Sequence, residues 1–270
     1  MRGLLWSIKF LTVIPIDRGN RFAPINTGAA MVWFPAVGLL IGAFLIAVYF
    51  LLIKWFPSTV ADALILVVYI VITGGLHLDG LADSCDGIFG GYDKEKRLEI
   101  MRQSTIGAFG VLGLICILGI KCISFHNLIY TPTLTLPHQG GGNPLSSFWF
   151  SQKGTVLLLM PAIGRWTQVL AAALSAYARK EEGVGKVFID NVRLRHAIYS
   201  ALFLLVPLWF FCKINGLMIF AIVIFVALLV IQYIKGKIGG MTGDTLGAIN
   251  EISEVVFILC FFIIIGHSER

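Results

Sequence analysis

The sequence predicts an all-α fold, a polytopic membrane helix bundle of about seven spans preceded by an N-terminal interfacial helix. Of its 270 residues, 57% are hydrophobic and only 13% are charged, against roughly 45–50% and about 25% in soluble domains. The mean hydropathy is +0.87, so too few polar residues remain to coat a soluble fold of this size. Apolar runs long enough to cross a bilayer recur along the chain. We therefore expect residues 1–270 to form a single integral membrane domain surrounded by membrane lipid.

The first element expected is an interfacial helix over Met1–Pro15. This segment contains Arg2 and Lys9, its apolar run is too short for a span, and no small-residue cleavage site follows it. Seven later runs have the length and composition of spans. They are Val32–Ile53, Val60–Leu76, Thr105–Phe125, Thr155–Ala176, Ala197–Cys212, Leu217–Ile234 and Leu246–Gly266.

Between the third and fourth spans lies a segment of different composition. The stretch Asn127–Lys153 contains Pro132, Pro137 and Pro144 together with the triple glycine Gly140–Gly142. Clustered proline and glycine are typical of loops. We expect a flexible external loop that carries no chemistry.

The basic residues indicate how the bundle is oriented. Fifteen lysines and arginines lie in the N-terminal segment and in the loops after the second, fourth and sixth spans, against four on the other side. Basic loops face the cytoplasm in most membrane proteins, so we expect these loops there. The basic residues are scattered and form no dense patch, which excludes a nucleic-acid partner despite the net charge of +6.

Three aspartates follow the second span directly. In the run TGGLHLDGLADSCDGIFGGYD, Asp79, Asp83 and Asp86 are spaced i, i+4 and i+7, so a helix places them within about 60° of one another. Clustered anions repel unless a cation neutralises them. Mg²⁺ prefers oxygen ligands and binds substrate phosphates as well. The spacing therefore predicts a metal site.

The residues around this cluster leave several questions open. Gly80 and Gly87 are expected to leave room for a ligand beside the carboxylates. A solvated acidic loop is the alternative, yet the segment joins an apolar span, and no lysine or arginine lies between Lys54 and Lys94. His77 lies just off the acidic face, where the roles of ligand, base and plain polar residue all stay open.

A second acidic group begins the last span, in the run TGDTLGAINEISE. Asp244 precedes the span, while Glu251 and Glu254 lie within it at +7 and +10. Acids inside a span are costly and mark function by default. Arg165, in the run PAIGRW, is a lone charge in the fourth span and has two readings. It clamps a phosphate, or it pairs with one of these glutamates.

A short helix is expected over the run DKEKRLEIMRQ, with Asp93 as its N-cap. Arg97 and Arg102 in this run are candidates for contact with an anionic substrate. A solvated helix face is the alternative for both.

At these residues the sequence resembles cobalamin-5'-phosphate synthase, also called adenosylcobinamide-GDP ribazoletransferase. The runs GGLHLDGLADSCDGIFGG, RLEIMRQSTIGAFG, GRW and TGDTLGAINEISE carry the resemblance. It extends from LWSIKFLTVIP at Leu5 over nearly the whole chain. Only the stretch Asn127–Lys153 departs from it, and we interpret that stretch as an insertion.

The resemblance implies a multi-pass inner-membrane enzyme that depends on Mg²⁺, with its active site facing the cytoplasm and other corrinoid-assembly enzymes as neighbours. Such an enzyme joins adenosylcobinamide-GDP to α-ribazole or α-ribazole 5'-phosphate and releases GMP. The acidic motif is also similar to that of CDP-alcohol phosphotransferases.

By this analogy each candidate residue receives a role. Asp79 and Asp83 bind the metal, and Asp86 is a metal ligand or a base. Asp83 and His77 join Asp86 as catalytic candidates. The residues expected to contact substrate are Arg102, Arg165, Asp244 and Glu251.

Two other function classes remain as alternatives. A CDP-alcohol lipid enzyme shares an acidic motif, but its pattern has an arginine soon after the alanine, where this chain has Asp83 directly after Ala82. A transporter uses intramembrane acids such as Glu251, but does not need three aspartates at the membrane face. An assay for GMP release separates all three classes.

Overall fold

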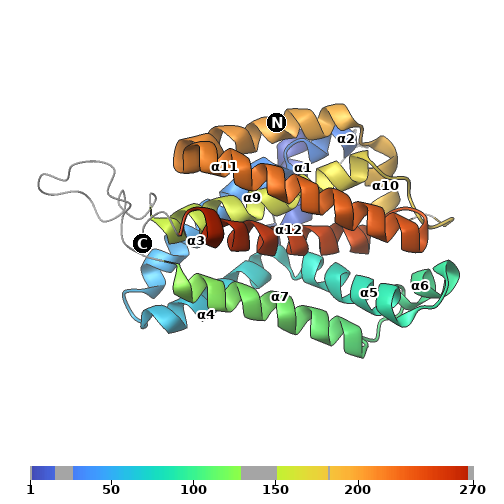
Figure 1. The fold of residues 1–270 in the computed structure, drawn as a ribbon, viewed down its shortest axis with the longest axis horizontal. Coiled ribbons are helices and arrows are strands. Elements are labelled where there is room, and N and C mark those ends of the chain that lie inside the picture. The colour runs from blue at the N-terminus through green and yellow to red at the C-terminus, as the bar shows by residue number, and fades with distance from the viewer. Residues whose placement is uncertain (1, 16–26, 129–150, 182, 267–270) are drawn as a thin grey trace, which may run out of the picture.

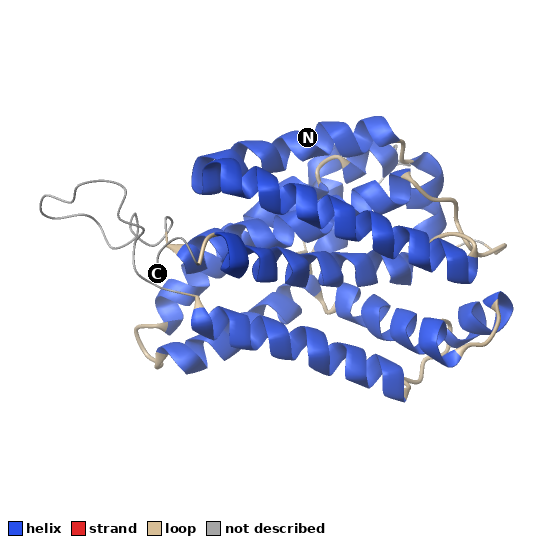
Figure 2. Ribbon diagram, viewed as in Figure 1, coloured by secondary structure: helices blue, strands red, loops and turns tan. Residues whose placement is uncertain are grey.

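The computed structural model describes residues 2–15, 27–128, 151–181 and 183–266 (Figure 1). Over these residues every regular element is a helix, as Figure 2 shows, apart from an isolated bridge between Tyr177 and Met241. The all-α prediction is confirmed. The helices are α1 (Arg2–Leu11), α2 (Thr27–Met31), α3 (Phe34–Leu52), α4 (Ser58–Thr73), α5 (Leu76–Gly90), α6 (Lys94–Ile100), α7 (Ala108–Asn127), α9 (Gln152–Ala173), α10 (Val184–Asn191), α11 (Leu194–Ile238) and α12 (Gly243–Ile264).

Among the described residues, five helices are long and apolar enough to cross a membrane, or six if the bent pair α4–α5 counts as one span. The five are α2–α3 taken together, α7, α9, α11 and α12. Many large apolar side chains of these helices are exposed, as expected for surfaces that face lipid. The chain is therefore a polytopic membrane protein, with an N-terminal helix α1 in addition.

Helix α11 accounts for two of the seven expected spans. Lys213 interrupts it with φ 52° and ψ −136°, a conformation that a side chain other than glycine rarely adopts. Figure 1 shows the two halves of α11 lying side by side after this reversal. Gly216 packs so closely on the turn that an added Cβ would lie 2.7 Å from the carbonyl oxygen of Leu208. The fifth and sixth predicted spans are thus the two arms of one helical hairpin.

The expected second span is shorter than predicted and bends where the acidic motif begins. Helix α4 ends at Thr73, and Gly74 and Gly75 follow with φ of +62° and +67°. Two consecutive left-handed residues are accessible to glycine at little cost. They turn the chain by 89° into α5, which packs against α12 and carries the aspartate cluster.

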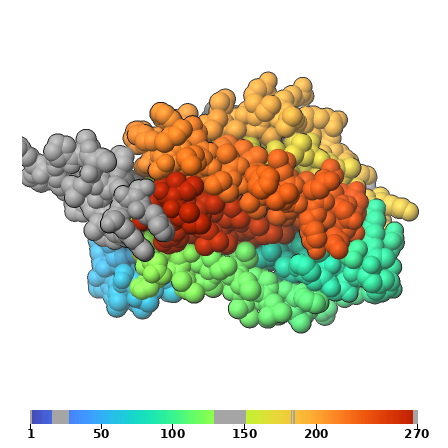
Figure 3. Space-filling view, in the orientation of Figure 1, coloured from blue at the N-terminus to red at the C-terminus, as the bar shows by residue number. Residues whose placement is uncertain are grey.

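Helix α9 is the centre of the bundle, with 94% of its apolar stretch buried. Helix α3 approaches it through Gly38, where an added Cβ would lie 2.6 Å from the backbone nitrogen of Ala162. Small residues allow such close helix packing in membranes. Helix α12 also packs on α9, and Figure 3 shows α12 between α11 and α7 on one face of the molecule. These contacts fix the end of α12 that carries Asp244.

The basic loops that we expected on one side of the membrane meet at one end of the bundle. The Arg97 guanidinium donates to the carbonyl of Lys237 at 3.3 Å, and that of Arg179 donates to the carbonyl of Met101 at 3.5 Å. The loops after the second, fourth and sixth spans are therefore in mutual contact. The predicted loop over 127–153 falls almost wholly outside the described residues.

Candidate active site

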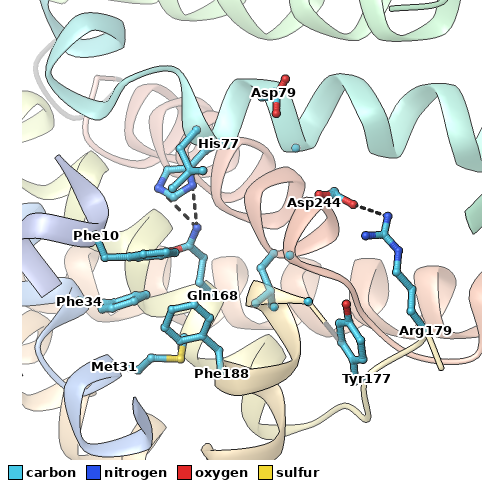
Figure 4. Close-up of a pocket in the computed structure, with 16 residues that line it drawn as sticks. Phe10, Met31, Phe34, His77, Asp79, Gln168, Tyr177, Arg179, Phe188 and Asp244 are labelled. Carbon is cyan, nitrogen blue, oxygen red and sulfur yellow. Dashed lines mark hydrogen bonds and ion pairs between the residues drawn. The ribbon is translucent and has the colours of Figure 1, made fainter. Parts of the chain in front are cut away.

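A cavity of about 430 Å³ lies where α1, α2, α3, α5, α9, α10 and α12 meet. Figure 4 shows that its two ends differ in chemistry. Phe10, Phe34 and Phe188 form one end, while Asp244 and Arg179 lie at the other. The remaining lining residues are Met31, Leu76, His77, Asp79, Gly80, Gln168, Tyr177, Gly183, Gly185, Gly243 and Leu246.

The two acidic groups identified from sequence meet at the polar end. A Cβ added to Gly80 would lie 2.6 Å from the carbonyl oxygen of Asp244, so α5 and α12 touch backbone to backbone there. Asp83 lies close enough to Asp79 and Asp244 to interact electrostatically with both. The structure therefore brings Asp79, Asp83 and Asp244 together, although they are separated by up to 165 positions in the sequence.

The two glycines noted in the acidic motif both lie at close helix contacts. Gly80 makes room for the backbone of α12, and a Cβ at Gly87 would lie 2.8 Å from the carbonyl oxygen of Arg97. Both glycines allow close helix packing, and Gly80 also lines the cavity.

Asp244 is held by an ion pair that the sequence analysis did not foresee. Its carboxylate accepts a hydrogen bond from the Arg179 guanidinium at 2.8 Å and one from the Thr242 hydroxyl at 3.2 Å. Within the described residues, the carboxylates of Asp79 and Asp83 make neither a hydrogen bond nor an ion pair. These two aspartates therefore remain free to bind a cation or to accept a proton.

Asp86 has a different environment, because its carboxylate binds the first turn of α7. One oxygen accepts from the backbone N–H of Gly107 at 2.7 Å and the other from that of Gly110 at 2.8 Å. Helix N-termini leave such N–H groups unpaired and favour negative charge. We had expected Asp86 to be a metal ligand or base, but the structure places it as the cap that joins α5 to α7.

His77 lies in the cavity wall and is 4% exposed. The amide nitrogen of Gln168 is 3.0 Å from its Nδ1. With the amide donating to Nδ1, the ring proton sits on Nε2. In that tautomer the Nε2–H of His77 is a hydrogen-bond donor in the cavity wall.

Arg165 and Glu251, both expected to contact substrate, do not line the cavity. They belong to a buried ion network in which Lys121 donates to Glu251 and to Glu254, each at 2.6 Å. Arg165 pairs with Glu254 at 2.7 Å and also donates to the Tyr69 hydroxyl. The two cations and two anions balance, and all four side chains are at most 4% exposed. For Arg165 the structure shows the pairing with a glutamate that the sequence left open, and it places Glu251 in the same buried network, away from the cavity.

Arg102 also lies apart from the cavity. Its half-exposed guanidinium pairs with Glu181 at the end of the bundle where the basic loops meet. This position matches the solvated-face alternative better than a place in the substrate cavity.

Several cavity residues carried no signal in the sequence. In the sequence Arg179 is one of several basic loop residues, and Gln168, Phe10, Phe34 and Phe188 do not differ from ordinary helix residues. The bridge between Tyr177 and Met241 holds the loop that carries Arg179 on the start of α12, and ring contacts between α1, α3 and α10 bring the three phenylalanines together. Only the full fold places them together.

The donor chemistry of the polar end fits a hard cation. Among the described residues, no three His, Cys, Asp or Glu side chains converge as a complete ligand set. Mg²⁺ does not need one, since it is usually bound by one or two carboxylates together with waters and substrate phosphates. Asp79 and Asp83, one helical turn apart and uncommitted, provide such a pair.

Comparison with known proteins gives a consistent result over the full length. The family model described as cobalamin-5-phosphate synthase matches residues 3–262. Three similar proteins are each named adenosylcobinamide-GDP ribazoletransferase. They come from Acetivibrio thermocellus, Clostridium acetobutylicum and Thermoanaerobacter pseudethanolicus, and are 34%, 34% and 35% identical to this chain.

These matches cover 97%, 98% and 97% of this chain and 98%, 97% and 97% of the relatives. No solved structure matches the chain. The comparisons favour neither the lipid enzyme nor the transporter alternative. The chain belongs to the cobalamin-5-phosphate synthase family.

Proposed function

We propose that this chain transfers the adenosylcobinamide-phosphate group of adenosylcobinamide-GDP to α-ribazole or α-ribazole 5'-phosphate and releases GMP. The observation that carries the proposal is the nearly full-length match to proteins named for this activity. The cavity supports it, since carboxylates and a guanidinium gather at one end and aromatic rings at the other.

In the proposed reaction, a ribazole hydroxyl oxygen attacks the phosphorus that bears the cobinamide. A new P–O bond forms, the phosphoanhydride P–O bond breaks, and GMP leaves with the bond's electron pair. The hydroxyl proton must pass to a base. Phosphoryl transfer of this kind depends mainly on positioning and on neutralising phosphate charge.

Asp79 and Asp83 would hold the Mg²⁺, which when bound neutralises phosphate charge as a Lewis acid. Arg179, held in place by its ion pair with Asp244, donates to the phosphates of the substrate through its Nε–H. Asp83 accepts the hydroxyl proton at a carboxylate oxygen. Because Gln168 orients its ring, His77 donates from Nε2 to the bound nucleoside.

We further propose that the chain lies in the inner membrane with this site on the cytoplasmic side. The polar end of the cavity and the contacts among Arg97, Arg179 and the loop before α12 occupy the same end of the bundle. Basic loops favour the cytoplasm. A nucleotide substrate made in the cytoplasm then reaches the site without crossing the membrane.

Sealed vesicles of known orientation test the activity and the sidedness together. Inside-out vesicles containing the chain are expected to release GMP from added adenosylcobinamide-GDP only when α-ribazole is present, and to stop when EDTA removes divalent cations. Right-side-out vesicles are expected to release none until they are opened with detergent. The readout is GMP by chromatography, with empty vesicles as the control.

Two results would count against the proposal. No ribazole-dependent GMP in any preparation contradicts the activity. Release by intact right-side-out vesicles alone contradicts the orientation and leaves the activity standing.

A further inference from the structure

The aromatic end of the cavity is built from three helices that lie far apart in the sequence. Phe10 of α1 and Phe188 of α10 have ring centroids 4.7 Å apart, and Phe34 of α3 lies 6.0 Å from each of them. Met31 completes this wall. Phe34, Phe188 and Met31 are at most 4% exposed, so this end offers flat apolar surface and no side-chain hydrogen-bonding group.

Two buried polar atoms of the lining have no partner within the described residues. They are the amide oxygen of Gln168, whose side chain is 4% exposed, and the Nε of Arg179. Leaving a buried polar atom without a hydrogen bond costs folding free energy, so such an atom indicates a partner such as a ligand or water. Gln168 lies between the aromatic end and the aspartates (Figure 4). An acceptor at this position suits a hydroxyl group, and the free Nε suits an anion.

We propose that this cavity is the nucleoside subsite, and that it takes the acceptor substrate α-ribazole with its planar base at the aromatic end. This inference rests on the proposed function. The ribose lies beside Gln168 and His77, its hydroxyl donating to the amide oxygen of Gln168. The reacting hydroxyl then faces the carboxylates of Asp79 and Asp83, and the phosphates of the other substrate lie beside Arg179.

Size and polarity favour this occupant over the corrinoid substrate. A cavity of about 430 Å³ encloses one molecule of drug size, within the range of roughly 300–1,000 Å³ for such pockets. A nucleoside has that size, whereas a corrinoid bearing GDP is several times larger. Guanine also has hydrogen-bonding groups on most of its edge, and Met31, Phe34 and Phe188 would leave them unpaired. The benzimidazole base of α-ribazole has an apolar outer edge that fits this wall.

Replacing one aromatic residue of the cavity wall tests whether α-ribazole binds there. The test compares the KM for α-ribazole with the KM for adenosylcobinamide-GDP. Phe188→Leu is expected to raise the KM for α-ribazole about tenfold, since stacking on an aromatic side chain contributes on the order of 1–3 kcal/mol per base. The KM for adenosylcobinamide-GDP is expected to stay unchanged. Phe225→Leu is the matched control, because Phe225 is 61% exposed on α11 and does not line the cavity. An unchanged KM for α-ribazole, or an equal rise in both constants, overturns the proposal.

A second variant gives a gain that misfolding cannot imitate. Met31→Ala enlarges the aromatic end, so kcat/KM for a ribazole analogue with one more fused benzene ring is expected to rise relative to that for α-ribazole. If this ratio does not change, the base does not lie against Met31.

Direct binding separates failure of this inference from failure of the proposed function. Calorimetry on the full chain in lipid nanodiscs, without corrinoid, is expected to show binding of α-ribazole, weakened by Phe188→Leu, and no binding of guanosine. Binding of guanosine in place of α-ribazole overturns the subsite assignment. Binding of α-ribazole without any GMP release in the vesicle assay supports the subsite while contradicting the proposed transfer.

Discussion

The variant Asp83→Asn is expected to release GMP at least about a hundredfold more slowly than the unsubstituted chain. Asparagine keeps the shape of the side chain but removes the negative charge and the proton acceptor. The loss of several kcal/mol of charge stabilisation at the phosphates corresponds to such a factor. Asp83 makes no hydrogen bond or ion pair within the described residues, so the folded structure does not depend on it. The measurement is kcat for GMP release at saturating substrate.

Asp190→Asn is the matched control, because Asp190 is exposed on α10 and does not line the cavity. Its kcat is expected to equal that of the unsubstituted chain. Near-normal turnover by correctly folded Asp83→Asn would show that this carboxylate neither holds the metal nor accepts the proton.

The largest loss of stability is expected for Lys121→Met. Lys121 is 1% exposed and bonds to two glutamates at 2.6 Å. Removing one partner of a buried ion pair typically costs about 3–5 kcal/mol, because a charge is left uncompensated. For a chain of this size that corresponds to a fall in Tm on the order of 10 °C. Thermal unfolding in detergent, with the exposed Lys54→Met as control, measures the effect.

A double variant tests whether charge is the cause. Lys121→Met together with Glu251→Gln leaves the Arg165–Glu254 pair balanced and is expected to recover part of the lost Tm. If the double variant is no more stable than Lys121→Met alone, lost packing and not uncompensated charge explains the destabilisation.

The sequence predicted the helical bundle well because composition and apolar run length determine it directly. The exceptions arise where tertiary contacts decide. Two consecutive glycines, Gly74 and Gly75, bend the second span by 89°. Lys213 folds α11 back on itself. Neither angle can be derived from the hydropathy of the flanking runs.

The aspartates show what helical spacing can and cannot predict. The spacing correctly placed Asp79, Asp83 and Asp86 on one helix, but it could not say what faces each of them. Asp86 lies seven residues beyond Asp79, about 10 Å farther along the axis. Helix α7 begins beside this part of α5, and the backbone N–H groups of Gly107 and Gly110 donate to the Asp86 carboxylate.

The charges inside the spans were recognised, but their pairing was not. A pairing of Arg165 with a glutamate is one of the two roles that the sequence indicates, and Arg165 does bind Glu254. Nothing in the sequence indicates that Lys121 binds both glutamates. Which charges meet depends on how α7, α9 and α12 pack, and a single sequence does not contain that information.

Our central proposal is that Asp79 and Asp83 bind the metal ion while Asp86 caps α7. A metal titration tests this assignment most directly. Mn²⁺ serves as the paramagnetic probe for the Mg²⁺ site, and free Mn²⁺ is measured by electron paramagnetic resonance with adenosylcobinamide-GDP present. The account predicts that Asp83→Asn weakens Mn²⁺ binding at least about tenfold, the loss of one carboxylate ligand, while Asp86→Asn leaves the affinity unchanged and lowers only thermal stability. Loss of Mn²⁺ binding in Asp86→Asn, with full affinity in Asp83→Asn, would contradict it.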